Sequence, residues 1–553
     1  MLHTHHRRRT HRLAACTALA LGVGLVSTGP VSTATAATAG TTALAKPRFD
    51  RDGDGRSDRI YRSATTGKLT IALSKTGTSA PFTIGNDDLD GAVSKEILAA
   101  DNLWGTAAPD LLTLRSDGTL RIHETVSPTA TSVTPVWQGN GWQIYNKVLA
   151  PGDLTKDGFQ DLLARTPSGA LYLYAGKGGV VDHTGPFKSR VKVGEGWQAY
   201  DQLVGTNDLD GDAIADLVAR TPGGDLYFYK GTGSATAPFR ARVRIGGGWN
   251  TYNQIIGADD LNGDGRGDLL ARTQSGTFYK YLSVGGGKFG TRTYYGGGGQ
   301  NLSYYLGQGG VPAYGKHSLL AVNAAGTAYT VGTLSDGTLT APRQYGGAGE
   351  QYWRVHNTHG LDEADRATVL TAYNPGLMSD RGGEVSTSAA FYNYAEIVSV
   401  GDVTEDGKAD VLGLDLWGNL FLHPGLKYYN PPRVGAAVKV ATGWHADTLV
   451  GTGDVTGDGR PDLVSRDNDR LYVHPGTGSA TAPFAARVLI GAGWGGYDHL
   501  ASPGDMNGDG RADLVAVTPG GDVYRYTATG LRGSATFGGR VKIASGWKYE
   551  DIS

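Results

Sequence analysis

The sequence contains very little cysteine and no excess of either charge. Cys16 is the single cysteine among 553 residues, and it lies in an N-terminal segment that we expect to be cleaved, so disulfides cannot staple the remaining chain. The 51 Lys and Arg residues nearly balance the 53 Asp and Glu residues, which leaves no basic footprint for nucleic acid. After the N-terminal segment, no run approaches the roughly 18 consecutive apolar residues of a membrane helix. We therefore expect neither nucleic-acid binding nor a membrane span. Without disulfides, bound metal is the better candidate for a stabilising cross-link.

Sequence signatures of catalysis are missing as well. The chain has no Gly-x-Ser-x-Gly elbow, no His-Glu-x-x-His pair and no phosphate-binding Gly-Lys-Ser/Thr loop. Every tight group of carboxylates lies in one repeated loop, so no separate acid–base pair is left. We expect a protein that is not an enzyme, with a secreted hydrolase or lyase as the weakest alternative.

The N-terminus has the features of an export signal. Four arginines within residues 7–12 form a positive region, Leu13–Val26 an apolar region, and Ala34–Ala36 a small-residue cleavage site. Residues 1–36 are therefore the expected signal peptide and residues 37–49 a short linker. The mature protein is expected to be secreted and extracellular.

A nine-residue acidic loop occurs seven times, for example as Asp50-Arg-Asp-Gly-Asp-Gly-Arg-Ser-Asp58. Oxygen-bearing side chains occupy positions 1, 3, 5 and 9, and position 6 is Gly in every copy but one, where it is Ala213. Hard oxygen ligands on a tight turn suit Ca²⁺, the expected cofactor. The expected metal ligands are Asp50, Asp52, Asp54, Asp58, Asp153, Thr155, Asp157, Asp161, Asp208, Asp210, Asp212, Asp216, Asp260, Asn262, Asp264, Asp268, Asp402, Thr404, Asp406, Asp410, Asp454, Thr456, Asp458, Asp462, Asp505, Asn507, Asp509 and Asp513.

A single loop of this kind is also compatible with an ordinary turn, because Asp and Gly are common turn formers. Three or four carboxylates packed into one turn repel each other unless a cation lies among them. Position 3 varies between Asp, Asn and Thr, yet it always keeps an oxygen. A plain turn does not require that oxygen, so the repeated set favours calcium.

The loops belong to a longer repeat, because the first aspartates at 153, 208 and 260 and at 402, 454 and 505 lie 51 to 55 residues apart, and the intervals from 50 to 153 and from 260 to 402 are two and nearly three such steps. Ten repeats result, and those near Asp101, Val311 and Leu361 lack the carboxylates and should bind no metal. Each repeat contains four short β-branched or aromatic segments bounded by turn residues. Four strands in about 50 residues predict the blade of an all-β propeller, with residues 50–307 as repeats 1–5 and 308–553 as repeats 6–10.

Ten blades allow two arrangements. Two five-bladed rings that divide near Gly307 are preferred, because propellers usually have about 4 to 8 blades. One large ring is the alternative. The segment Gly546–Ile552 would then pair with the unit that begins at Asp50, which removes both exposed sheet edges.

The acidic loop ahead of a strand such as Asp161-Leu-Leu-Ala164 resembles the FG-GAP or VCBS repeats of integrin-α-type β-propellers. The resemblance implies calcium bound between two strands of a blade by the residues named above, with Ala213 as a departure. Gly-x-Gly-Trp-x-x-Tyr, and Leu-Tyr-x-Tyr after a Gly turn, are similar to tachylectin-type propeller lectins. That weaker resemblance implies five-bladed rings that bind amino sugars between blades.

A tryptophan recurs at one position of the repeat, and we expect it either to pack between blades or to stack on sugars. These candidate ligand-binding residues are Trp142, Trp197, Trp249, Trp444, Trp494 and Trp547. A recurrent arginine (Arg165, Arg220, Arg272 and Arg466) is expected to pair with loop carboxylates. Together the patterns predict a secreted, calcium-stabilised binding module. Extracellular carbohydrate is the first expected partner, and a surface protein, as for an adhesion or scaffold propeller, is the alternative.

Overall fold

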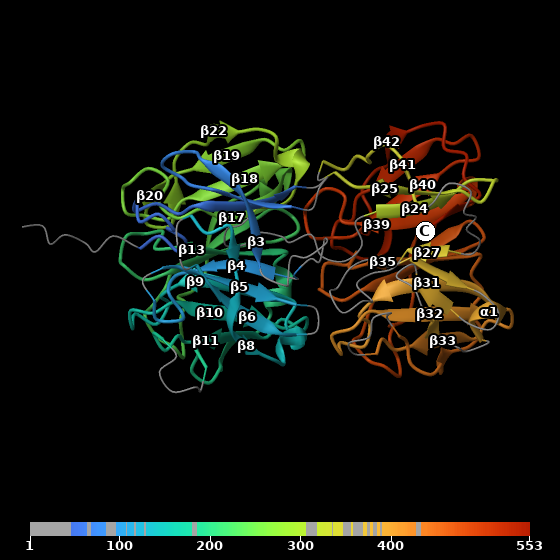
Figure 1. The fold of residues 1–553 in the computed structure, drawn as a ribbon, viewed down its shortest axis with the longest axis horizontal. Coiled ribbons are helices and arrows are strands. Elements are labelled where there is room, and N and C mark those ends of the chain that lie inside the picture. The colour runs from blue at the N-terminus through green and yellow to red at the C-terminus, as the bar shows by residue number, and fades with distance from the viewer. Residues whose placement is uncertain are drawn as a thin grey trace, which may run out of the picture. The chain divides into compact units, whose positions relative to one another are not determined.

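The structure is a computed structural model. It describes residues 46–553 except 64–67, 85–93, 95, 107, 116–117, 126–128, 180–184, 306–317, 335, 347–354, 358–368, 373–376, 380–383, 387–389 and 427–432. Within these residues the fold is all-β, built from the four-stranded antiparallel sheets of β-propeller blades, one of which has a fifth, parallel strand (Figure 1). The part of the chain that is described holds no helix with the length and apolar character needed to cross a membrane.

Strands within residues 59–305 form the first set of sheets, drawn from blue to green in Figure 1. They are β23-β1-β2-β3-β7 (Leu302–Tyr305, Arg59–Ser63, Leu69–Ala72, Ser79–Ile84, Ser132–Val133), β4-β5-β6-β8 (Glu96–Ala100, Asp110–Leu114, Leu120–Glu124, Pro135–Gly139), β9 to β12 (Lys147–Gly152, Asp161–Arg165, Leu171–Tyr174, Val191–Gly194), β13 to β16 (Gln202–Asn207, Asp216–Arg220, Leu226–Tyr229, Val243–Gly246) and β17-β18-β19-β22 (Tyr252–Gly257, Leu269–Thr273, Phe278–Tyr281, Thr293–Gly296).

Strands within residues 318–552 form the second set, drawn from yellow to red. They are β43-β24-β25-β26 (Asp551–Ile552, Ser318–Val322, Ala328–Gly332, Arg343–Gln344), β27 to β30 (Val355–Asn357, Val369–Ala372, Leu377–Ser379, Glu384–Ser386), β31 to β34 (Tyr394–Gly401, Asp410–Asp415, Leu420–His423, Val438–Ala441), β35 to β38 (Thr448–Gly453, Asp462–Asp467, Arg470–His474, Val488–Ala492) and β39 to β42 (His499–Gly504, Asp513–Val517, Val523–Tyr526, Val541–Ala544). The smaller elements are β20 (Ser283–Gly285) with β21 (Lys288–Phe289), α1 (Ala390–Asn393) and the 3₁₀ turns η2 to η7 (Trp142–Ile144, Trp197–Ala199, Trp249–Thr251, Gly299–Asn301, Trp494–Gly496, Gly533–Ala535).

The second strand of most described blades is buried on both faces, because a neighbouring sheet covers each side; β1, which alternates between half-buried and buried positions, is an exception. In β14, the segment Asp-Leu-Val-Ala-Arg is buried at every position, whereas the fourth strand β16 is exposed or half-buried. This explains why the second strand has an almost continuous apolar run instead of strict alternation. Apolar clusters lie between consecutive sheets; one joins Leu163 of β10 to Leu217 of β14.

Strand pairing and the apolar clusters link the sheets into two sets. The segment Leu302–Tyr305 returns to pair with β1, and the C-terminal strand β43 pairs with β24. The C-terminal strand therefore does not join the first unit, as the single-ring alternative requires. Separate clusters join β17 and β18 to β23, and β39 and β40 to β24. These contacts favour two sets of five sheets, while the predicted boundary at Gly307 lies outside the described residues.

The described end of the expected linker is part of the core. Arg48 and Phe49 are 2% and 1% exposed. The Arg48 guanidinium donates to the carboxylate of Asp259 (2.7 Å) and to the main-chain carbonyls of Ala150 (3.2 Å) and Gly205 (2.9 Å), which belong to β9 and β13. Because one side chain satisfies acceptors from several sheets, this segment ties the first set together instead of serving as a free linker.

Candidate functional site

Each acidic loop connects the two innermost strands of a sheet, except that the Asp50 loop directly precedes β1, whose inner neighbour is β23. The loop Asp153–Asp161 leads from β9 to β10, and the loop Asp208–Asp216 leads from β13 to β14. The acidic loops therefore lie where the resemblance implies, between two strands of a blade. All seven loops lie in the described part of the chain.

The position-1 carboxylate of each loop accepts main-chain hydrogen bonds from its own turn. Asp153 accepts from the amide of Asp157 (3.2 Å) with one oxygen and from that of Gly158 (2.7 Å) with the other. The same pair of contacts recurs at Asp50, Asp208, Asp260, Asp402, Asp454 and Asp505. Position 6 has a left-handed backbone, as at Gly158 (φ 90°), which explains its glycine; Ala213 adopts the same region (φ 65°).

The position-9 carboxylate fastens the loop to the third strand. Asp161 is fully buried and accepts from the amide of Leu154 (2.8 Å) and, with its other oxygen, from the amide of Gly176 (3.0 Å) beyond β11. Burial raises the pKa of Asp161 to about 7, and the nearby carboxylates of Asp153 and Asp157 add to the shift. Equivalent contacts to the third strand are made by Asp58, Asp216, Asp268, Asp410, Asp462 and Asp513.

Position 3 provides the evidence that these loops fit a cation. The Thr155 hydroxyl, the Thr456 hydroxyl and one carboxylate oxygen of Asp210 are buried and have no hydrogen-bond partner. Buried polar atoms are rarely left unsatisfied, and a cation that prefers oxygen ligands, bound in each loop, would give each of the three atoms a partner. The donor set of oxygens alone suits Ca²⁺ better than a metal that prefers nitrogen or sulfur.

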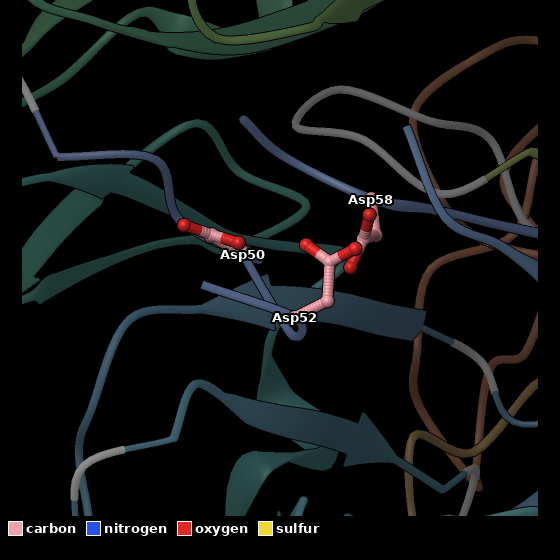
Figure 2. Close-up of side chains that lie close together, drawn as sticks. All are labelled: Asp50, Asp52 and Asp58. Carbon is pink, nitrogen blue, oxygen red and sulfur yellow. The ribbon is translucent and has the colours of Figure 1, made fainter. Parts of the chain in front are cut away.

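Two loops bring three carboxylates together. In the Asp50 loop, oxygens of Asp50, Asp52 and Asp58 lie within 4.8 Å of one another, and in the view of Figure 2 the carboxyl group of Asp52 lies between the other two. Oxygens of Asp208, Asp210 and Asp216 lie equally close in their loop. These are the two loops with Asp at position 3, so the extra carboxylate completes both clusters.

The degenerate repeat near Asp101 keeps the contacts within the turn but not the contact to the third strand, because the second carboxylate oxygen of Asp110 is buried without a hydrogen-bond partner. Asn102 accepts from the amide of Thr106 (2.8 Å), and Asp110 accepts from the amides of Leu103 (2.7 Å) and Trp104 (2.7 Å). These contacts repeat those of positions 1 and 9, whereas positions 3 and 5 are Trp104 and Thr106. Two of the conserved oxygens therefore build the turn itself. The predicted empty repeats near Val311 and Leu361 lie outside the described residues.

The recurrent arginine does not bind the loop carboxylates, contrary to the sequence expectation. Arg165 donates to the main-chain carbonyls of Trp197 (3.1 Å) and Tyr200 (2.7 Å) in the turn before the next sheet. Arg220, Arg272 and Arg466 make the equivalent contacts. The reason is geometric: the arginine lies near the end of the second strand, beside the main-chain carbonyls of the turn that precedes the next sheet.

The recurrent tryptophans are largely covered by other aromatic side chains. Trp142, Trp197, Trp249 and Trp494 are buried, and Trp444 and Trp547 are half-buried. The ring of Trp197 lies 4.7 Å from that of Tyr229, whose hydroxyl meets the Tyr200 hydroxyl at 2.6 Å. Arg242 donates to the same Tyr200 hydroxyl. This burial accords with the packing alternative, and sugar contact by these six residues stays an untested prediction.

An exposed pair of apolar residues, Leu416 and Trp417, was not predicted from the sequence. Both are 79% exposed, in the turn between β32 and β33. The equivalent turns contain Pro167-Ser168, Pro222-Gly223 and Pro519-Gly520. An alignment of the internal repeats would have revealed the pair, because large apolar residues at a hairpin turn depart from the pattern of the other blades.

Comparison with known proteins supports the repeat assignment. A family model described as FG-GAP-like repeat matches residues 208–271 and 454–516, and each match contains two consecutive acidic loops, which start at Asp208 and Asp260 and at Asp454 and Asp505. Among solved structures, the chain is similar to the BP39L lectin from Burkholderia pseudomallei, with 12% identity, 82% of this chain and 99% of that chain covered, and a TM-score of 0.28. No curated protein matches the sequence.

Proposed function

We propose that this protein is a secreted, calcium-stabilised β-propeller that acts as a binding module for extracellular carbohydrate. Its ten repeats form two five-bladed rings, which the return of Leu302–Tyr305 to β1 and of β43 to β24 supports. FG-GAP-like repeats at two places and a chain without catalytic motifs support a binding role instead of an enzymatic one. The observation that carries the calcium assignment is the buried, unpartnered oxygen at position 3 of three loops.

Calcium would be held by the side chains at positions 3 and 5, with positions 1 and 9 completing the set. The carboxylates at positions 1 and 9 accept main-chain hydrogen bonds, so the turn is arranged before the ion binds. Bound calcium supplies positive charge that relieves repulsion among the carboxylates. The role of the ion is therefore structural: it stabilises the loop between the two inner strands in the blades that have such a loop.

Carbohydrate contact is assigned to the exposed turn of Leu416 and Trp417. A solvent-exposed indole offers a flat apolar face, the kind of surface on which sugar rings stack. Two further aromatic side chains are exposed: Tyr294 in β22 (67% exposed) and Tyr392 in α1 (52% exposed). A surface protein that binds the same turn is the alternative partner.

A glycan array with the wild type, Trp417→Ala and Tyr294→Ala tests the ligand assignment. We expect wild-type binding to at least one glycan class, a loss of at least about tenfold for Trp417→Ala, and unchanged thermal stability, because the removed side chain is exposed. Tyr294→Ala is the control for the loss of any exposed aromatic ring. If the wild type binds no glycan but retains a surface protein through Trp417, the adhesion alternative replaces the lectin proposal.

A further inference from the structure

One acidic loop is contacted by a lysine that follows the third strand of its blade, at a position where the other six blades with a loop have an uncharged residue. Lys230 directly follows β15, and its ammonium contacts the carboxylates of both Asp210 and Asp212 (2.8 Å to Asp212). Lys230 directly precedes Gly231, whose amide donates to the position-9 carboxylate of Asp216. The residues at the same place in the other six blades with a loop are Leu73, Ala175, Leu282, Pro424, Pro475 and Thr527.

The contacts of Lys230 fall on positions 3 and 5, which are the positions left for a metal. Asp208 at position 1 and Asp216 at position 9 already accept main-chain hydrogen bonds. In other loops a basic side chain reaches position 5 alone, as Lys188 does at Asp157 (2.7 Å) from a 53% exposed position. An ammonium that bridges positions 3 and 5 takes up the ligand oxygens that a cation at this loop needs.

The loop still has an unsatisfied acceptor. The Asp210 side chain is 7% exposed, and one of its oxygens has no hydrogen-bond partner. Oxygens of Asp208, Asp210 and Asp216 lie within 4.8 Å of one another. The loop can therefore still attract a cation, but the cation has to compete with Lys230.

We propose that Lys230 is a built-in counter-cation, which holds the Asp208 loop together without metal and makes it the weakest calcium site of the seven loops. This inference rests on the proposed calcium binding of the other loops. The Asp50 loop provides the natural comparison, since it also has Asp at position 3 and a triad within 4.8 Å, but Leu73 stands in place of the lysine.

Reciprocal substitutions test the proposal in the full-length mature chain. Calcium binding is measured by titration calorimetry for the wild type, Lys230→Met and Leu73→Lys. We expect Lys230→Met to tighten the weakest site by roughly tenfold, and Leu73→Lys to weaken one site by a similar factor. Lys188→Met is the control and should change neither the number of sites nor their affinity by more than about twofold.

Thermal melts in EDTA give a second readout that does not depend on calcium. Lys230→Met should lower the melting temperature in EDTA by roughly 2–4 °C, and saturating calcium should remove the difference. If Lys230→Met does not fold in EDTA, the double variant Asp210→Asn/Lys230→Met, which reproduces the Asn262 type of loop, should restore folding.

Unchanged calcium affinity together with an unchanged melt in EDTA for Lys230→Met would overturn the proposal. A wild type that binds no calcium at any loop would instead refute the proposed function. In that case the EDTA melts alone still decide whether Lys230 acts as the counter-cation.

Discussion

At the scale of single residues, the carboxylates of an acidic loop have two different roles. Asp260 and Asp268, at positions 1 and 9 of one loop, accept main-chain hydrogen bonds from the turn and from the third strand. Asp264 at position 5 lies closer to solvent and contacts Arg266. We infer that positions 1 and 9 stabilise the loop with or without metal, whereas position 5 acts mainly through the ion.

Two substitutions in the Asp260 loop separate these roles. Asp268→Asn turns one buried acceptor into a donor that faces the main-chain amides of Leu261 or Ser283, so it should cost about 1–3 kcal/mol of unfolding free energy in calcium and in EDTA alike. Asp264→Asn should reduce the stabilisation by calcium and leave the stability in EDTA nearly unchanged. Denaturant unfolding of both variants under both conditions measures this. A larger effect of Asp264→Asn in EDTA would contradict the assignment.

Buried histidines give the fold a dependence on pH. His474 stacks on Trp444 at 4.4 Å and its Nε2 lies 2.8 Å from the Ser465 hydroxyl. Burial lowers the pKa of His474 from 6.5 to about 4. The unfolded chain then binds a proton near pH 6.5 and the folded chain does not, so unfolding free energy is retained above about pH 6.5 and falls toward pH 4.

The loss attributed to His474 is about 3 kcal/mol between these limits. Two other blades have tyrosine at the equivalent position, Tyr174 and Tyr229. His474→Tyr introduces this residue and removes the titrating group. The stability difference between the variant and the wild type should therefore shift in favour of the variant as the pH is lowered from 7 to 5. Urea unfolding at both pH values checks this, and a difference that does not change with pH would rule the histidine out.

At the scale of elements, the four-stranded blade could be predicted because its signals are local. Turn residues, the apolar second strand and the oxygen pattern of the loop all lie within about 50 consecutive residues. Contacts between blades could not be predicted in this way. The partners of Arg165 are carbonyls of Trp197 and Tyr200, more than 30 positions along the chain, and no sequence pattern distinguishes them from loop carboxylates.

The exposure of Leu416 and Trp417 could not be predicted from the sequence either. Within one blade, two apolar residues beside β32 resemble a continuation of the strand. Their exposure follows from the turn that Gly418 permits with a left-handed backbone (φ 77°). The candidate metal residues were found because their oxygens recur seven times, whereas a feature that occurs in one blade gives no such signal.

At the scale of the whole molecule, Arg48 connects sheets that are far apart in the sequence. It pairs with Asp259, and its guanidinium also donates to carbonyls of β9 and β13. Burial lowers the pKa of Arg48, and the attraction of Asp259 opposes that shift. The pair is therefore a buried ion pair with additional hydrogen bonds, whose disruption leaves a buried charge.

Arg48→Met should cost about 3–5 kcal/mol of unfolding free energy, because Asp259 then stays buried without its partner. Arg48→Met/Asp259→Asn should recover much of that loss, because no uncompensated charge remains and asparagine tolerates the left-handed backbone of this position (φ 54°) and can still accept from Asn207. Urea unfolding of both variants makes the comparison. A loss below about 1 kcal/mol for Arg48→Met would show that the segment around residue 48 is a dispensable linker.

A thermal melt of the wild type with millimolar calcium and with EDTA tests whether the seven acidic loops bind calcium. Extracellular loop sites bind calcium at about 10⁻⁴ to 10⁻³ M, so millimolar calcium should contribute roughly 0.4 to 1.4 kcal/mol per site. The seven loops together should add roughly 3 to 10 kcal/mol, a clear rise in melting temperature that magnesium at the same concentration does not reproduce. Equal melting temperatures in calcium and EDTA would contradict the central claim that these loops are calcium sites.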